Sequence, residues 1–232
     1  FSQNRPKGRV AMMTEKGFEL RGVSVGESNQ RRLDDVSVDI PASGITVLAG
    51  PSGAGKSTLL RLLNRLDVAD QGSVRWQGSL LDDLDVLAHR RQVGMVFQKP
   101  TAVPGTVADN LRLAAPAMDD DAVVALLATV ALDAGFLNRN ALELSGGERQ
   151  RVCLARTLAT NPVVVLADEP TASLDPDATA IIETSVQHLA DPNGPHRVGW
   201  VWVSHDAEQT ERLASRVIAL DGGRIVRPEL DG

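Results

Sequence analysis

The sequence predicts an α/β domain with a mainly parallel sheet, an antiparallel β subdomain near the N-terminus and an inserted helical subdomain. Short apolar runs alternate with helical patterns along most of the 232 residues, as a parallel sheet requires. Two stretches break this alternation. Residues 18–40 show period-2 apolar spacing around a polar turn, and residues 106–141 show helical spacing. With 43% hydrophobic residues, a chain of this length can bury one sizeable core.

The individual elements follow from local patterns. A Leu-rich segment, residues 59–66, has the spacing of a buried helix. Asp175 and Pro176 are typical of an N-cap and a first helical residue, so a helix is expected to begin there. Residues 221–226 predict a tight turn into a last strand. Five apolar runs are expected to form the parallel sheet, most of them buried on both faces: residues 45–49, 94–97, 163–167, 198–203 and 217–220.

Composition limits the classes of function and partner. The formal net charge of −6 gives no overall basic field, so no nucleic-acid partner is expected. The single cysteine, Cys153, excludes an internal disulfide, favours a reducing compartment and is expected to be buried. No apolar run approaches the roughly 18 residues of a membrane span, so a partner would have to supply any spans. We expect residues 1–13 to be a disordered lead-in or tag and residues 14–232 to form one domain.

A glycine-rich segment after the first predicted parallel strand is typical of phosphate binding. Residues 50–57 match the pattern G-x-x-x-x-G-K-S/T in full, between a strand and a helix. Backbone N–H groups of such a loop turn inward around phosphate oxygens, and the helix N-terminus adds partial positive charge. Lys56 is expected to reach the β- and γ-phosphates and Ser57 to ligate Mg²⁺. The candidate nucleotide-binding residues are Gly50, Pro51, Ser52, Gly53, Ala54, Gly55, Lys56, Ser57 and Thr58.

An acidic pair follows another predicted strand. The apolar run at 163–167 leads directly into Asp168 and Glu169. This places two carboxylates at the carboxyl edge of a parallel sheet, where ligand sites of α/β proteins lie. Asp168 is expected to hold Mg²⁺, directly or through water, and Glu169 to polarise an attacking water as a general base.

A phosphate loop and an acidic strand end occur in many nucleotide-binding proteins, and a third segment is more specific. Its sequence, at residues 144–151, is Leu-Ser-Gly-Gly-Glu-Arg-Gln-Arg. It resembles the signature of the ATP-binding-cassette (ABC) ATPase family, which also lies shortly before the acidic strand. Ser145, Gly146 and Gly147 precede an amphipathic helix, so they form a second helix N-terminus able to receive phosphate. The resemblance covers nearly everything from residue 18 to 226 and implies a P-loop NTPase core, with the helical subdomain inserted at approximately residues 99–150.

Three further residues match the family in order. Gln98 is similar to the glutamine that links the Mg²⁺ site to the helical subdomain, and it is expected to act in catalysis and metal binding. Asp175, in Ser-Leu-Asp at 173–175, is similar to the loop that crosses a dimer interface and helps to hold the nucleotide there. His205 resembles the switch histidine that contacts the γ-phosphate.

The resemblance implies ATP and Mg²⁺ as cofactors and a head-to-tail dimer, homodimeric or with a similar subunit, that sandwiches two ATP molecules. It also implies an integral membrane permease as partner, with this chain on the cytoplasmic, inner face of the membrane. Two alternatives remain open: a soluble ABC ATPase acting on DNA or ribosomes, and a regulatory ATP-binding module without a transport role. Neither a long coiled coil nor a second cassette, as such soluble relatives carry, occurs in the sequence.

One element departs from the family pattern. Residues 23–27 lack the aromatic residue that usually stacks on adenine, and the chain has no tyrosine. We therefore expect the base to lie on aliphatic surface near Val25 or under Arg31 or Arg32. The cargo is also open, because residues 93–100 are similar to phosphate importers whereas residues 101–110 look closer to exporter-type or metal-related cassettes.

Overall fold

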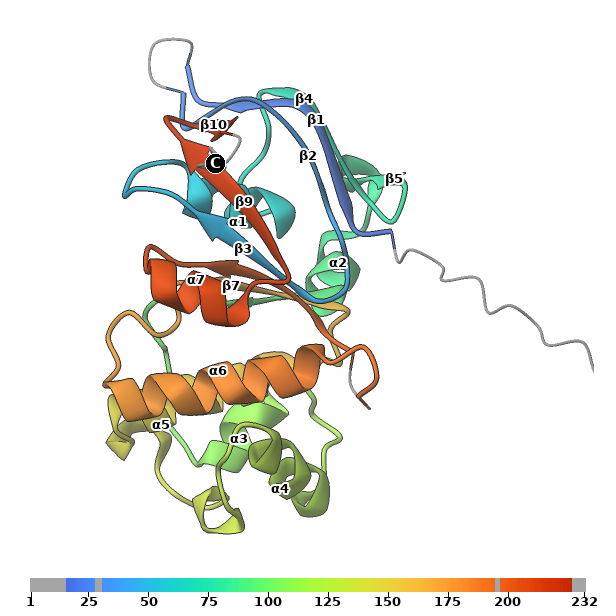
Figure 1. Cartoon of the computed structure of the whole chain (residues 1–232). Coiled ribbons are helices and arrows are strands. Elements are labelled where there is room, and N and C mark those ends of the chain that lie inside the picture. Colours follow the sequence, from blue (N-terminus) through green and yellow to red (C-terminus); the bar gives the residue numbers. More distant parts are fainter. Residues whose placement is uncertain (1–15, 28–30, 195–196, 227–232) are drawn as a thin grey trace, which may run out of the picture.

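The computed structural model describes residues 16–27, 31–194 and 197–226 (Figure 1). Its strands form two sheets, and a group of helices lies at the end of the molecule away from the antiparallel sheet. The mixed α/β class, the mainly parallel sheet and the antiparallel β unit are confirmed. The predicted lead-in at residues 1–13 lies outside the described residues. Among those described, no helix has both the length and the apolar character needed to cross a bilayer.

The larger sheet contains all five predicted strands, which run parallel to one another in the order β9-β3-β8-β7-β6. A sixth strand, β10, pairs antiparallel with β9 after the predicted turn. One detail of the prediction was wrong: Phe97 lies beyond the end of β6 and is 52% exposed. The bounds are β3 (Ile45–Ala49), β6 (Val93–Val96), β7 (Val164–Asp168), β8 (Gly199–Val203), β9 (Arg216–Asp221) and β10 (Arg224–Val226).

The smaller sheet is antiparallel, in the order β2-β1-β4-β5. The pairing of β1 (Phe18–Val25) with β2 (Leu33–Ile40) was predicted. The addition of β4 (Gln71–Trp76) and β5 (Ser79–Leu80) was not. Their connection, Gln77-Gly78, has positive φ at both residues, 50° and 87°. Two such residues match the twist of flanking antiparallel strands, so this turn closes the hairpin.

Seven helices and three short 3₁₀ turns complete the described chain. The predicted Leu-rich helix is shorter than expected. Arg65 takes a left-handed conformation (φ 56°), so the helix stops before Leu66, which is 36% exposed. The helices are α1 (Lys56–Leu63), α2 (Val86–Gln92), α3 (Val107–Arg112), α4 (Asp120–Thr129), α5 (Gly146–Leu158), α6 (Pro176–Ala190) and α7 (Ala207–Leu213). The 3₁₀ turns are Leu81–Asp83, Ala134–Phe136 and Ala141–Glu143.

The parallel sheet separates two hydrophobic cores. Alternate residues of β7 point to opposite faces, so Val165 belongs to the core with the helices α3 to α6, and Leu166 to the core with α1 and the antiparallel sheet. Cys153 lies in α5 and is 7% exposed, so the prediction that it is buried is confirmed. Because both faces are packed, the strand ends cannot move independently, and their carboxyl edge is a rigid platform for side chains.

A buried histidine joins α2 to the antiparallel sheet. The His89 ring lies 6.4 Å from Phe18 and 6.1 Å from Trp76, between ring centroids. Its Nε2 donates to the Leu63 carbonyl at 2.8 Å, while Nδ1 is buried and has no partner among the described residues. Burial lowers the pKa of His89 below its ordinary value, and the nearby charge of Arg65 acts in the same direction.

This histidine predicts a loss of stability in acid. The unfolded chain binds the His89 proton more readily than the folded one, so the free energy of unfolding falls as pH drops below about 6.5. His89→Met removes this titration, and we expect a shallower decline between pH 7.5 and 5.5 in urea unfolding. His188→Gln, at an exposed histidine of α6, is the matched control and should keep the wild-type slope. Equal slopes for His89→Met and wild type would contradict the assignment.

Candidate functional site

The predicted site residues gather at the carboxyl edge of the parallel sheet. Strand β3 leads into the glycine-rich loop, β6 precedes Gln98, β7 leads into the acidic pair and β8 precedes His205. These four strands are adjacent and parallel in the order β3-β8-β7-β6, so their carboxyl ends meet at one edge. Segments that lie far apart in the sequence are thereby brought side by side, as expected for an α/β ligand site.

The glycine-rich loop keeps an open concave surface. A Cβ at Gly55 (φ 100°) would lie 2.4 Å from the Arg32 carbonyl oxygen, so only glycine fits at this close approach. Gly53 (φ 80°) has nothing within 4 Å on its Cβ side, and that side faces open space. Of the other loop residues, Pro51, Ser52 and Ser57 are exposed, Gly50 is half-buried, and Ala54 and Thr58 are buried.

Lys56 is buried with its ammonium group at the loop. Its side chain is folded back so that Nζ donates to the carbonyl oxygens of Gly50 (2.7 Å) and Pro51 (2.8 Å). The residue is 5% exposed and has no carboxylate partner among the described ion pairs. An ammonium group has three N–H donors, so one remains for an anion at the loop. A buried cation with this arrangement favours a negatively charged ligand.

Ser57 and Asp168 form the next part of the site. The Ser57 hydroxyl donates to Asp168 Oδ1 at 2.9 Å, which joins the start of α1 to the end of β7. Burial raises the pKa of the Asp168 carboxyl, the Ser57 hydrogen bond opposes the shift, and the negative charge of Glu169 adds to it. Burial makes the ionised form of this carboxyl costly, and a cation beside it would lower that cost. The pair thus has the oxygen ligands that Mg²⁺ prefers.

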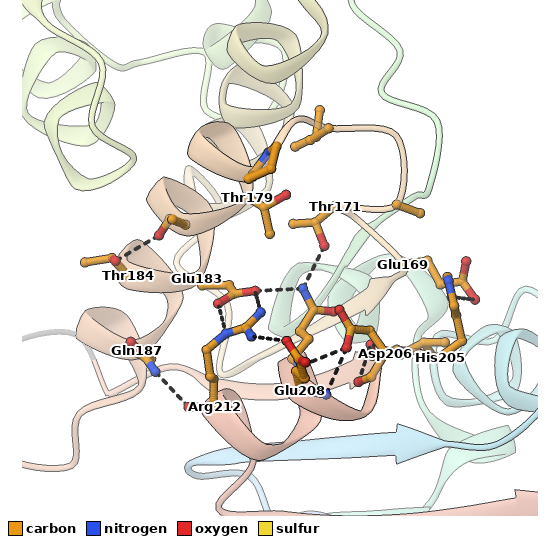
Figure 2. Close-up of a pocket in the computed structure, with 17 residues that line it drawn as sticks. Glu169, Thr171, Thr179, Glu183, Thr184, Gln187, His205, Asp206, Glu208 and Arg212 are labelled. Carbon is orange, nitrogen blue, oxygen red and sulfur yellow. Dashed lines mark hydrogen bonds and ion pairs between the residues drawn. The ribbon is translucent and has the colours of Figure 1, made fainter.

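Glu169 is held between two other predicted residues. Its Oε2 accepts a hydrogen bond from Gln98 Nε2 at 3.2 Å. Its Oε1 lies 3.4 Å from His205 Nδ1, a contact that Figure 2 shows. The backbone of Glu169 is left-handed, with φ at 45°, a conformation that non-glycine residues rarely adopt. Two other predicted side chains, those of Gln98 and His205, therefore meet at the Glu169 carboxylate.

The signature segment occupies a different position. Ser145 is the N-cap of α5, where its Oγ accepts from Glu148 N at 3.3 Å and its own N–H donates to Glu148 Oε2 at 2.8 Å. Gly147 packs so closely on α6 that a Cβ there would lie 2.9 Å from the Ala178 Cβ. Asp175 caps α6 by accepting from Ala178 N at 2.9 Å. No hydrogen bond or ion pair between described residues joins Ser145, Gly146, Gly147 or Asp175 to residues 50–58.

The prediction for the base was wrong at Val25. This residue is 2% exposed and packs in the core, so it offers no aliphatic surface to a ligand. Arg31 donates to Asp34, and Arg32 Nη1 lies 3.5 Å from Asp67 Oδ2, so both guanidinium groups have carboxylate partners. A pocket of about 310 Å³ lies nearby, lined by Ser24, Gly26, Glu27, Arg31, Asp70 and Gln71.

One group of polar residues beside the site was not found from the sequence. Thr171, Glu183, Gln209 and Arg212 line a cavity of about 900 Å³ that also reaches Glu169 (Figure 2). They come from the loop after β7, from α6 and from α7, and the first three are less than 9% exposed. Buried polar side chains of this kind require partners. No local motif marked them, because each has its partner on another element.

Comparison with known proteins places the chain in a family. The family model described as "ABC transporter" matches residues 33–172. ABC transporter I family member 17 of Arabidopsis thaliana is 42% identical over 229 residues, which cover 97% of this chain and 82% of that protein. Protein STAR1 of Oryza sativa subsp. japonica is 43% identical, and the match covers 95% of this chain and 62% of STAR1. The phosphate import ATP-binding protein PstB 3 of Natronomonas pharaonis is 38% identical, covering 91% and 81%.

Solved structures agree with the fold. CbiO1 from Clostridium perfringens, part of the transporter complex CbiONQ, has a TM-score of 0.82 at 22% identity, covering 92% of this chain and 88% of CbiO1. The ATP-binding cassette MJ0796, in a dimeric post-hydrolysis state bound to ADP and Pi, has a TM-score of 0.76 at 30% identity, covering 90% and 97%. The chain therefore belongs to the ABC transporter family and is one of its ATP-binding, ATP-hydrolysing domains.

Proposed function

We propose that this chain is the subunit that hydrolyses ATP to power transport through a separate membrane permease. The observation that carries the proposal is the convergence of Lys56, Ser57, Asp168, Glu169 and His205 at one edge of the sheet. A regulatory module that only binds nucleotide has no need of a carboxylate held between an amide and an imidazole. This arrangement favours hydrolysis over binding alone.

The phosphate loop and the Ser57–Asp168 pair fit a Mg²⁺–nucleotide. Lys56 and the backbone N–H groups of the loop would hold the phosphates. Ser57 Oγ and Asp168 would hold Mg²⁺, with the Gln98 amide as a further ligand. The metal supplies charge neutralisation at the phosphates when bound. Burial raises the pKa of Asp168, and a bound cation would favour the ionised form of its carboxyl, so the position suits a metal ligand.

Glu169, Gln98 and His205 would carry out the chemistry. The Glu169 carboxylate is placed to accept a proton from water as a general base. The His205 imidazole contacts the Glu169 carboxylate and would approach the transferred phosphate. Gln98 bonds Glu169 directly and lies at the start of the segment that leads to α3, so it would report the state of the site to the helical subdomain.

The second anion-binding helix start implies a partner subunit. The N-terminus of α5 is capped at Ser145 but is not joined to residues 50–58 within the described chain. We propose that Ser145, Gly146 and Gly147 of one subunit close on the phosphates held by another, with Asp175 at the same interface. The structure of MJ0796, a relative, is dimeric and holds ADP and Pi, which supports the need for a partner subunit.

A surface on the helical side is proposed to contact the permease. Leu113, at the end of α3, is 64% exposed and borders a cavity of about 320 Å³ together with Met95, Ala114, Arg156 and Thr157. An exposed leucine beside a hollow with apolar and basic lining suits a short helical loop of a membrane protein. Under this proposal, the chain lies on the inner face of the membrane, and the permease selects the cargo.

Copurification tests the permease proposal. We expect affinity-tagged chain from detergent-solubilised native membranes to carry a stoichiometric protein with several apolar spans, identified by mass spectrometry. Leu113→Asp should reduce recovery of this partner at least about tenfold, an interface hot-spot effect, while the isolated chain keeps its ATPase rate. Val68→Asp is the matched control, because Val68 is equally exposed, at 69%, but lies after α1. Recovery of ribosomal or nucleic-acid-bound material instead would overturn the proposal.

A further inference from the structure

The loop after Glu169 is tied to α7 by one buried amide side chain. Gln209 is 6% exposed, and its Nε2 donates to Thr171 Oγ1 at 2.9 Å and to Glu183 Oε1 at 2.9 Å. Its Oε1 accepts from Trp202 Nε1 at 3.2 Å. An indole N–H only donates and a carboxylate only accepts, so these partners determine which way the amide points. Both amide hydrogens of Gln209 and its oxygen are thus engaged.

An ion pair anchors this amide. Arg212 donates from Nε and Nη2 to the two carboxylate oxygens of Glu183, each at 3.0 Å (Figure 2). Burial by itself would raise the pKa of Glu183, but the hydrogen bonds from Arg212 and Gln209 outweigh it and hold that pKa below its ordinary value. An ionised carboxylate that accepts two hydrogen bonds from one guanidinium group has a defined position. Glu183 therefore fixes Gln209, and Gln209 in turn fixes Thr171.

Thr171 is part of the turn that begins at Glu169. The amide of Ala172 donates to the Glu169 carbonyl at 3.2 Å, and the amide of Leu174 donates to the Thr171 carbonyl at 3.1 Å. The left-handed backbone at Glu169 is unfavourable for a residue with a side chain and persists only where its surroundings hold it. The buried hydroxyl of Thr171, two residues along, accepts from Gln209 and so fastens the backbone of this turn to α7.

The same helix also places His205. Asp206 directly follows His205 and caps α7, because its Oδ1 accepts from Glu208 N at 2.9 Å and from Gln209 N at 3.2 Å. The start of α7 thus sets where His205 lies. One turn later, the Gln209 amide donates a hydrogen bond to Thr171. The segment from His205 into α7 therefore contacts the Glu169 carboxylate through His205 and the turn that follows Glu169 through Gln209.

We infer that Gln209 is a positioning residue for ATP hydrolysis: through Thr171 it holds the turn at Glu169, so that the carboxylate stays aligned with His205. This inference rests on the proposed role of Glu169 as general base. Gln209 and Thr171 do not bond residues 50–58, so the hydrogen bond between them should affect turnover and leave nucleotide binding nearly unchanged.

Paired substitutions at Thr171 test the inference. Thr171→Val keeps the shape but removes the acceptor, whereas Thr171→Ser keeps the hydroxyl. We expect Thr171→Val to lower kcat about 10- to 100-fold, since a small misplacement of a catalytic group has effects of this size. The KM for ATP should stay within about twofold, because residues 50–58, which would bind the phosphates, make no hydrogen bond with Thr171. Thr171→Ser should restore most of kcat.

Ser185→Ala is the control for a purely structural effect. Ser185 is also buried, at 8% exposure, but its hydroxyl bonds Ile181 within α6, so its loss should lower stability without lowering kcat. If Thr171→Val yields no folded protein, Gln209→Met, which cannot donate, takes its place. A kcat unchanged in the folded variant, or one not restored by Thr171→Ser, overturns the inference. A wild-type rate in Glu169→Gln would instead overturn the role of Glu169.

Discussion

Replacing Glu169 by Gln should reduce ATP turnover about 10²- to 10⁴-fold, the usual effect of losing a general base. The amide has the size of the carboxylate and can remain between Gln98 and His205, but it cannot accept a proton from water. ATP binding should remain, because the contacts of Lys56 with the phosphate loop do not involve residue 169. Phosphate release measures the first effect, and equilibrium nucleotide titration measures the second.

Two controls separate chemistry from binding. Lys56→Ala should weaken nucleotide affinity itself, because it removes the buried ammonium group at the loop. Glu19→Gln makes the same change of charge on β1, in the antiparallel sheet, and should leave turnover unchanged. If Glu169→Gln hydrolyses ATP at the wild-type rate, the general base is another group and the assignment made here is wrong.

The second large effect concerns assembly. The Glu169→Gln chain should be monomeric without nucleotide and should dimerise with ATP and Mg²⁺, because the uncleaved γ-phosphate can then be held by both subunits. Adding Ser145→Arg should abolish the dimer. A long side chain at the start of α5 would occupy the position that we assign to phosphate. Sedimentation velocity with and without ATP measures both outcomes.

Loss of the helix cap must be separated from this steric block. Ser145→Ala removes the Oγ that accepts from Glu148 N, which typically costs about 1 kcal/mol of stability. It adds no bulk, so the Ser145→Ala, Glu169→Gln chain should still dimerise with ATP. A persistent monomer of the ATP-loaded Glu169→Gln chain counts against the sandwich model, and a dimer of the Ser145→Arg variant counts against the role of this helix start.

Contiguous patterns in the sequence were enough to predict the parallel sheet and the main motifs. The buried strands read as uninterrupted apolar runs because both of their faces are covered by packed layers. The phosphate loop has its required glycines and its lysine within eight residues. The start of α6 was marked by Asp175, which bonds Ala178 only three residues away. Each of these features depends on neighbours in the chain, so one sequence contains the information.

Local reasoning failed where the decisive contact came from another part of the chain, and also where the local signal was weak. Val25 was predicted to offer surface, but the packing of two sheets buries it. Leu66 was predicted to continue a helix that the left-handed Arg65 ends. The hairpin of β4 and β5 went unnoticed because its apolar alternation is weak and only the Gln-Gly turn marks it.

The same reasoning applies to the polar network beside the site. Thr171 and Gln209 are 38 positions apart, and neither belongs to a motif, yet their hydrogen bond joins the turn after Glu169 to the helix after His205. Short motifs were enough to predict which groups could perform the chemistry, because each motif is contiguous in the chain. How those groups are held became visible only in the folded chain, because the cost of burying a polar side chain is offset by partners that folding brings from distant segments.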